Sequence, residues 1–435
     1  MKFFKIIRFY FNLYFAFFKK HRKIILLGIV LGTLSFFLYN RFSPLLIVKK
    51  KKIGMVGKYN VQNLPLEIQK LISIGLTSVS PGGEISQGIA ESWIIEEEGK
   101  IYTFSLKNNL FWHDGKPVKA GDINFNFSDV KTVVVDDKTI KFELKEPFSP
   151  FLSVVSKPLF KKNLIGVGDY KVKKIKTTGE AIEKIQLVSL NKKPKEVLEF
   201  RFYPTEESLK IAFKLGEIDV AKDLTDYQDF VNWKGIKITP EVKSNLFVAL
   251  YFNTQNEKFS EKSTRQALSY AIKKEWKPRA LSSYNFQSQF YNPNVKNYDY
   301  NLSRAKELLE KKPQEIEIAT TVSLLLVAEK IKQDWSQLGI ETKIKIISKL
   351  ENEEAILITQ EIPEDPDQYP MWHSTQKFNL SHLKNPRLDK LLEEGRKTID
   401  KEKRKQIYFD FQRFLTEEAP AVFLFYPTLY TISRV

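Results

Sequence analysis

The sequence of 435 residues contains no cysteine. This absence excludes disulfide bonds, thiolate catalysis, zinc or iron–sulfur sites built on cysteine, and a lipid anchor attached through a cysteine. Histidine is also scarce: His21, His113, His373 and His382 show no H-x-x-x-H or H-E-x-x-H spacing. No glycine-rich phosphate loop is present, and Ser374 beside His373 is not part of a G-x-S-x-G elbow. The residues therefore predict no catalysis, no metal site and no cofactor.

Acidic side chains are missing from the first part of the chain. Residues 1–52 hold 12 Lys or Arg and no Asp or Glu. The rest of the chain holds 57 basic and 52 acidic residues, so the net charge of +17 belongs mostly to the N-terminus. A basic N-terminus beside an apolar run is typical of a membrane topology signal. Because no DNA- or RNA-binding motif accompanies the charge, nucleic acid is not an expected partner.

The N-terminal residues predict a membrane anchor. Ile24–Tyr39 contains 16 residues without a charge, fewer than the ~20 that span a bilayer, but flanking Lys and Arg can extend the span by snorkelling. We expect a basic cytoplasmic segment over 1–23, a transmembrane signal anchor over 24–48, and the remaining chain on the extracytoplasmic face. A cleavable signal peptide is the alternative, although no small-x-small cleavage site follows the apolar run. The aromatic residues 3–18 are interpreted as an interfacial helix or as a hydrophobic lead-in to the anchor.

Beyond Ile53 the sequence predicts a mixed α/β chain that begins with antiparallel hairpins. The first hairpin is expected between strands at 92–96 and 101–106, around Glu98-Gly99-Lys100. The second is expected between strands at 132–135 and 139–144, around Asp136-Asp137-Lys138.

A strand–helix–strand unit is predicted later in the chain. Its parts are a strand at 316–320, a helix at 324–338 that ends before Gly339, and a strand at 340–347. A crossover of this length places both strands parallel in one sheet. The remaining predicted elements are helices at 263–273 and 403–418 and a buried strand at 422–426.

The order of short motifs resembles the family 5 solute-binding proteins of ABC transporters, which include the oligopeptide- and dipeptide-binding group. The motifs that carry this resemblance are Gly88–Trp93 (GIAESW), Tyr102–Lys107 (YTFSLK), Phe111–Pro117 (FWHDGKP), Ala120–Ile123 (AGDI), Leu215–Asp219 (LGEID), Tyr251–Thr254 (YFNT), Arg265–Ile272 (RQALSYAI), Asp365–Asp367 (DPD) and Glu417–Pro420 (EEAP). Each motif is weak alone, but their shared order covers residues from about 53 to 430.

The resemblance implies an α/β, two-lobed periplasmic-binding-protein-like fold of the class II type, with mixed sheets and flanking helices. Lobe I is expected at 49–250, lobe II at 251–419, and a return strand to lobe I at 420–435. Hinge segments are expected near 246–253 and 420–426. The stretch after Ile123 is shorter than is usual in the family, so the small subdomain of lobe I is expected to be trimmed.

The resemblance also implies ligand-binding residues. In peptide-binding members an Asp of the Asp-Pro motif pairs with the ligand's α-ammonium, and the matching residue is Asp365. A buried ammonium requires a carboxylate partner, although an ordinary surface turn is the alternative interpretation. Trp372 and His373 are expected to offer aromatic wall area, with a place in the lobe core as the alternative for Trp372. Asn253, in the first hinge segment, completes the expected set.

Other polar residues near these motifs have two interpretations. Glu364 and Asp367 flank the Asp-Pro motif and could share its role. The adjacent His113 and Asp114 suggest acid–base chemistry, but the family resemblance places them in a structural turn. Arg265 is expected to form a structural ion pair rather than a ligand contact.

Together these features predict the extracytoplasmic substrate-binding protein of an ABC importer. It would act as a monomer that captures peptides between closing lobes and presents them to permease subunits, without catalysis. A second interpretation within the same fold is capture of a non-peptide solute such as an oligosaccharide or a metal chelate. A third is a surface protein for adhesion or sensing without transport.

Overall fold

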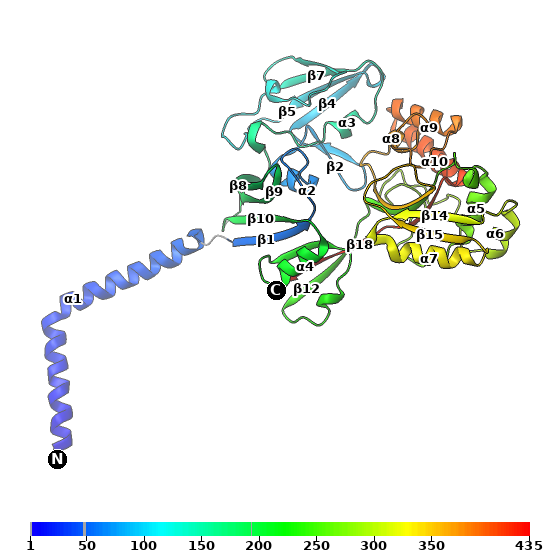
Figure 1. Cartoon of the computed structure of the whole chain (residues 1–435). Coiled ribbons are helices and arrows are strands. Elements are labelled where there is room, and N and C mark those ends of the chain that lie inside the picture. The colour runs from blue at the N-terminus through cyan, green and yellow to red at the C-terminus, as the bar shows by residue number, and fades with distance from the viewer. Residues whose placement is uncertain (1, 47–48, 193) are drawn as a thin grey trace.

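The computed structural model describes residues 2–46, 49–192 and 194–435. A long helix, α1 (Lys2–Leu46), projects away from a body of two lobes (Figure 1). The expected anchor at 24–48 includes residues 47 and 48, which lie outside the described residues. Within the described parts of the chain, no helix combines the length and the apolarity that crossing a bilayer requires. The predicted transmembrane anchor is therefore not supported.

Lobe I is built on a mixed sheet of seven strands. In spatial order these are β12 (Ile236–Val242), β18 (Thr428–Arg434), β11 (Val220–Leu224), β1 (Lys49–Val56), β10 (Glu196–Tyr203), β9 (Ala181–Ser189) and β8 (Tyr170–Thr178). Helices α2 (Leu66–Ile72) and α4 (Glu206–Lys214) pack against it. The last strand of the chain, β18, lies between β12 and β11, so the C-terminus is part of lobe I.

A smaller sheet forms a subdomain on lobe I. Its four strands are β4 (Ala90–Glu96), β5 (Ile101–Leu106), β7 (Thr139–Glu143) and β6 (Lys131–Val134). The short strands β2 (Thr77–Val79) and β3 (Ile85–Gln87) and the helix α3 (Phe151–Val154) lie beside it. Both predicted hairpins are confirmed, because β4 pairs with β5 and β6 with β7, each antiparallel.

Lobe II is built on a sheet of five strands. These are β15 (Glu341–Ile346), β14 (Glu315–Thr320), β16 (Ala355–Glu361), β13 (Leu246–Phe252) and β17 (Ala421–Phe425). Its helices are α5 (Lys262–Tyr270), α6 (Leu302–Leu308), α7 (Leu325–Ser336), α8 (Tyr369–Trp372), α9 (Pro386–Lys397) and α10 (Lys401–Glu418). Short 3-10 turns lie at Glu97–Gly99, Ala120–Asp122, Lys162–Leu164, Gln228–Phe230, Glu257–Phe259 and Val322–Leu324.

The strand β13 is apolar along its whole length because both faces of the lobe II sheet are covered. Val248, Leu250 and Phe252 pack into one hydrophobic cluster, whereas Phe247 and Tyr251 pack into another on the opposite face. Side chains alternate across a strand, so a continuous apolar run requires a sheet that is buried on both sides.

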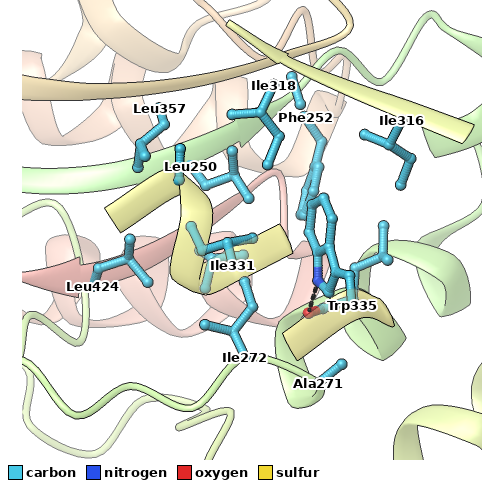
Figure 2. Close-up of a cluster of buried hydrophobic side chains, with 14 of the residues drawn as sticks. Leu250, Phe252, Ala271, Ile272, Ile316, Ile318, Ile331, Trp335, Leu357 and Leu424 are labelled. Carbon is cyan, nitrogen blue, oxygen red and sulfur yellow. Dashed lines mark hydrogen bonds between the residues drawn. The ribbon is translucent and has the colours of Figure 1, made fainter. Parts of the chain in front are cut away.

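The predicted strand–helix–strand unit is confirmed. β14 and β15 pair in parallel, and α7 connects them. Figure 2 shows Ile331 and Trp335 of α7 packed in the core of lobe II. The indole of Trp335 is fully buried and donates to the carbonyl of Leu268 at 3.1 Å, which satisfies its one polar atom.

The chain passes between the lobes at two short crossovers. The first, residues 243–245, joins β12 of lobe I to β13 of lobe II, and the second, residues 426–427, joins β17 to β18. The expected boundary after residue 250 falls inside β13, and the one after residue 419 falls just before β17, rather than at the crossovers. The reason is that β13 and β17 pair with each other inside lobe II.

Candidate ligand-binding cleft

Two cavities lie between the lobes. The first, which we call the hinge cavity, has a volume of about 470 Å³ and includes residues of the first crossover in its wall. Lobe I contributes Lys70 and Val79, and lobe II contributes Tyr284, Asn285 and Ile362. The second, which we call the outer cavity, has a volume of about 450 Å³ and lies between the subdomain and α10. Both volumes fall in the range of roughly 300–1,000 Å³ that is usual for small-ligand sites.

The hinge cavity has charged groups in its wall, but they are balanced in pairs. Lys70 of α2 meets Glu364 of lobe II at 2.6 Å, and this ion pair connects the two lobes. Lys243 in the first crossover contacts Glu241 at 2.9 Å. Apolar side chains such as Val242 and Ile362 line the same cavity. A wall of this kind suits a ligand that has polar ends and an apolar body.

Asp365 lines both cavities. Its carboxylate accepts two hydrogen bonds from Arg404 of α10, at 2.5 and 3.2 Å. It also accepts a hydrogen bond from the hydroxyl of Ser153, which reaches from lobe I across the cleft at 3.1 Å. The backbone N–H of Asp367 is a further donor at 2.9 Å. The expected ligand carboxylate is thus in the cleft, but it already has a cationic partner.

The electrostatics around Asp365 are those of a buried ion pair. Burial alone would lower the pKa of the Arg404 guanidinium, but the attraction of Asp365 outweighs burial and raises it. Nearby, burial raises the pKa of the Asp367 carboxyl, and Arg396 at 2.8 Å offsets this only in part. Buried charges that are paired and hydrogen-bonded resist separation, so this cluster fixes the loop that follows β16.

A second contact closes the outer side of the cleft. The backbone N–H of Ser149 in lobe I donates to the carbonyl of Arg396 at 2.8 Å, and the Ser149 hydroxyl donates to the same oxygen at 3.0 Å. Lys397 pairs with Glu146 at 2.9 Å. The end of α9 is therefore fastened to the segment before α3, and the two lobes touch on the side away from the crossovers.

The other expected ligand residues do not line either cavity. Trp372 is buried in lobe II, where its ring stacks on Tyr251 at 5.6 Å and its indole N–H donates to Gln368 at 3.1 Å. His373 is also buried and stacks on Tyr369 at 4.1 Å. These placements agree with the core alternative for Trp372.

Asn253 lies at the end of β13 and holds a turn. Its side-chain carbonyl accepts a hydrogen bond from the backbone N–H of Gln255 at 3.1 Å, and its side-chain amide donates to the side chain of Asn352 at 3.2 Å. These contacts account for its polar atoms without a ligand. The structure thus brings only Asp365, of the four expected ligand residues, to the cleft.

Two other motif residues have structural positions. His113 follows a buried Trp112, and its ring donates to the carbonyl of Gly168 at 2.8 Å. Gly115 adopts a φ of +83°, which the turn requires and which favours glycine. Arg265 is buried and donates to the carbonyl of Glu418 at 2.7 Å, so it caps the end of α10.

Sequence reasoning missed several cleft residues. Arg404 occupies the first turn of α10, where the apolar periodicity of residues 403–418 gives no sign of a buried cation. Ser153 and Lys70 are ordinary polar residues of short helices or their flanks. Their importance depends on partners that are distant in sequence, so no local signal could have identified them.

Comparison with known proteins supports the fold and identifies the family. The dipeptide-binding protein of Escherichia coli K12 is 24% identical, with 86% of each chain covered. The substrate-binding protein CtaP from Listeria monocytogenes superposes with a TM-score of 0.76 at 23% identity, covering 88% of this chain and 94% of that one. The oligopeptide-binding protein AppA from Bacillus subtilis, solved with a nonapeptide, superposes with a TM-score of 0.71 at 20% identity, covering 89% and 94%.

The model of the family described as "Bacterial extracellular solute-binding proteins, family 5 Middle" matches residues 84–376. This range spans more than half of the chain, from β3 through β13 to the segment after α8. The two lobes, the crossovers between them and the cavities they enclose are consistent with this match. The chain therefore belongs to the family 5 bacterial extracellular solute-binding proteins.

Proposed function

We propose that this protein is the substrate-binding protein of an ABC importer and that it captures short peptides between its lobes. The observation that carries the proposal is the hinge cavity of about 470 Å³, which residues of both lobes line. A ligand that contacts both lobes stabilises the closed arrangement and is withdrawn from solvent. Relatives that bind dipeptides and a relative solved with a nonapeptide support peptides as the ligand class.

Both lobes recognise the ligand, and none of their side chains catalyses a reaction. The protein acts without catalysis, its body faces the extracytoplasmic side, and a single copy delivers the ligand to the permease subunits. Support comes from the non-catalytic character of a solute-binding family and from a cleft whose charged groups are mostly engaged in pairs.

Native mass spectrometry of the full chain, purified in mild detergent from a bacterial host, tests the peptide proposal. We expect adducts of mixed mass that fragment into short peptides. A mixed peptide library should also raise the melting temperature, because a ligand of the folded state stabilises it. A clean mass without adducts, together with no thermal shift from the library, would contradict peptide capture and favour the oligosaccharide or metal-chelate alternative.

Asp365 remains our candidate for the peptide's α-ammonium, with the refinement that it must share its charge with Arg404. Binding of one peptide with a free amino terminus and of its N-acetylated form would be compared by calorimetry. We expect Asp365→Asn to weaken the free-amine peptide alone, whereas Ser153→Ala leaves the preference for the free amine unchanged. Equal losses for both peptides in Asp365→Asn would limit Asp365 to holding the lobes together.

A further inference from the structure

The first half of α1 has two unlike faces. Arg8, Asn12, Lys19 and Lys23 follow one another at intervals of 4, 7 and 4 residues. At about 100° per residue these intervals place them on one side of the helix. The stripe they form is basic and uninterrupted by any acidic residue, since residues 1–52 contain no Asp or Glu.

Most of the remaining circumference of the same segment is apolar, and Tyr10, Tyr14 and Phe17 lie opposite the basic stripe. One apolar surface on it is formed by Ile7, Tyr10, Phe11, Tyr14, Phe15 and Phe18. These residues repeat at intervals of 3 and 1, which is the pattern of a single helix face. Phe11, Tyr14 and Phe15 are each more than 65% exposed. No described residue of either lobe covers this face, and α1 stands clear of the body (Figure 1).

The described residues of the two lobes therefore leave this aromatic surface of α1 exposed to solvent. A continuous apolar face of this kind leaves water when an apolar phase is available. Aromatic side chains, and Tyr in particular, favour the boundary between lipid headgroups and acyl chains because they have an apolar body and a polar tip. The basic stripe on the other side fits anionic headgroups.

We propose that residues 6–23 of α1 form an amphipathic helix that lies along the surface of an anionic phospholipid bilayer, with its aromatic face immersed and its basic stripe at the headgroups. The charge selects this partner over a second copy of the helix, because two such basic stripes repel each other. It also selects an anionic over a neutral bilayer, because the basic side chains are attracted to negatively charged headgroups. This attraction acts within a Debye length of about 8–10 Å, which a helix lying on the surface satisfies. The assignment concerns where the protein sits and is independent of what the cleft binds.

Depth mapping with the full chain tests the geometry. Because the chain has no cysteine, single cysteines can be placed in turn at positions 7–19 and labelled with a nitroxide. In vesicles of phosphatidylglycerol and phosphatidylcholine we expect immersion to rise and fall with a period of about 3.6 residues. Positions 10, 14 and 17, which lie opposite the basic stripe, should be deepest, and positions 8, 12 and 19 wettest. Depth that increases steadily along the segment, or that shows no period, would overturn the proposal.

Charge reversal tests the lipid partner. Reversal of Arg8, Lys19 and Lys23 to Glu should lower partitioning of the segment into anionic vesicles by about a hundredfold, as read from the immersion signal at position 14. The matched control reverses Lys116, Lys234 and Lys377, which are exposed on the body, and keeps the same net charge. Equal immersion of both variants, or equal immersion of the wild type in pure phosphatidylcholine vesicles, would overturn the assignment. Both variants should show the same peptide adducts in detergent. A negative result for membrane binding can therefore be distinguished from a negative result for peptide capture.

Discussion

The ion pair between Asp365 and Arg404 is the most demanding interaction of the cleft at the scale of single residues. Both side chains are largely withdrawn from solvent, with 13% and 9% of their surface exposed. A buried charge without its partner is costly, so Arg404→Met should reduce the free energy of unfolding by roughly 3–5 kcal/mol. Chemical denaturation of the full chain in detergent measures this loss.

The neighbouring pair provides a control for that experiment. Arg396 contacts Asp367 at 2.8 Å, but 28% of its side chain is exposed. Because Arg396 is already partly solvated, its loss in Arg396→Met should cost less than that of Arg404 in Arg404→Met, even though the Asp367 carboxylate is only 7% exposed. Equal losses in the two variants would mean that burial does not set the strength of these pairs.

Glu199 should make the stability of lobe I depend on pH. Burial would raise its pKa, but hydrogen bonds from Lys50, Gln186 and Arg201 outweigh burial and lower the pKa to about 2. The unfolded value is 4.5, so the folded state favours the charged form. The stabilisation is complete above pH 4.5 and disappears as the pH falls toward 2.

Comparison of Glu199→Gln with the wild type measures this contribution. The variant should be less stable by roughly 1–3 kcal/mol at neutral pH. The difference should shrink as thermal unfolding is repeated at successively lower pH below 4.5. A difference that stays constant over this range would show that the carboxylate's charge is not its source.

At the scale of elements, the stability of α10 depends on the cap at its N-terminus. The side chain of Asp400 accepts from the backbone N–H of Lys403 at 2.8 Å and caps the helix. Asp400→Ala should cost about 1 kcal/mol of stability, whereas Asp400→Asn retains an acceptor and should be nearly neutral. Urea midpoints of the two variants provide the measurement, and similar losses in both would contradict a capping role.

Elements with a local pattern could be predicted from the sequence, and those with a distant cause could not. The hairpins around Gly99 and Asp137 and the helix before Gly339 depend on short-range periodicity and turn residues, and all are confirmed. The expected lobe boundaries differ from the crossovers because β13 and β17 pair with each other inside lobe II. Both are apolar strands, and their sequences do not indicate which lobe contains the partner strand.

The cleft shows the same limit more strongly. Asp365 was expected from a motif, but Ser153 lies 212 residues away along the chain and Arg404 lies 39 residues away. The sequence alone does not decide whether Trp372 lines the cleft or packs in the core of lobe II. Its stacking on Tyr251 requires that α8 packs against β13. Contacts between residues so far apart exist only after the lobes have folded, so the sequence could indicate the family and one cleft residue but not the cleft.

At the scale of the whole molecule, the lobes are held by two kinds of contact. The crossovers are covalent and allow rotation, whereas the other contacts between the lobes include hydrogen bonds and ion pairs that can break. These breakable contacts include Ser153 with Asp365, Lys70 with Glu364, Lys397 with Glu146, and the hydrogen bonds of Ser149 to Arg396. We therefore expect the lobes to be partly closed without ligand, and the three side-chain pairs to contribute to that closure.

Removal of all three contacts should shift the molecule toward an open state. Exposed ion pairs contribute ~0–1 kcal/mol each and a hydrogen bond ~0.5–1.5 kcal/mol, so Lys70→Ala, Ser153→Ala and Lys397→Ala together should weaken closure by about 2 kcal/mol. This corresponds to about a thirtyfold change in the ratio of closed to open molecules. Ligand affinity should fall in parallel, because less of the protein is in the binding-competent state.

Fluorescence transfer between the lobes can measure this shift. Val134 on the subdomain and Leu326 on α7 are exposed, and the chain has no other cysteine, so Val134→Cys and Leu326→Cys can carry the donor and acceptor. The control replaces Lys234, Lys312 and Ser336 by Ala, which changes the same residue types at exposed positions away from the cleft. We expect the triple cleft variant alone to show lower transfer without ligand and recovery of transfer at saturating ligand. Unchanged transfer would mean that the three side-chain contacts do not hold the lobes closed, and that the crossovers, the packing around them and the Ser149 hydrogen bonds do so.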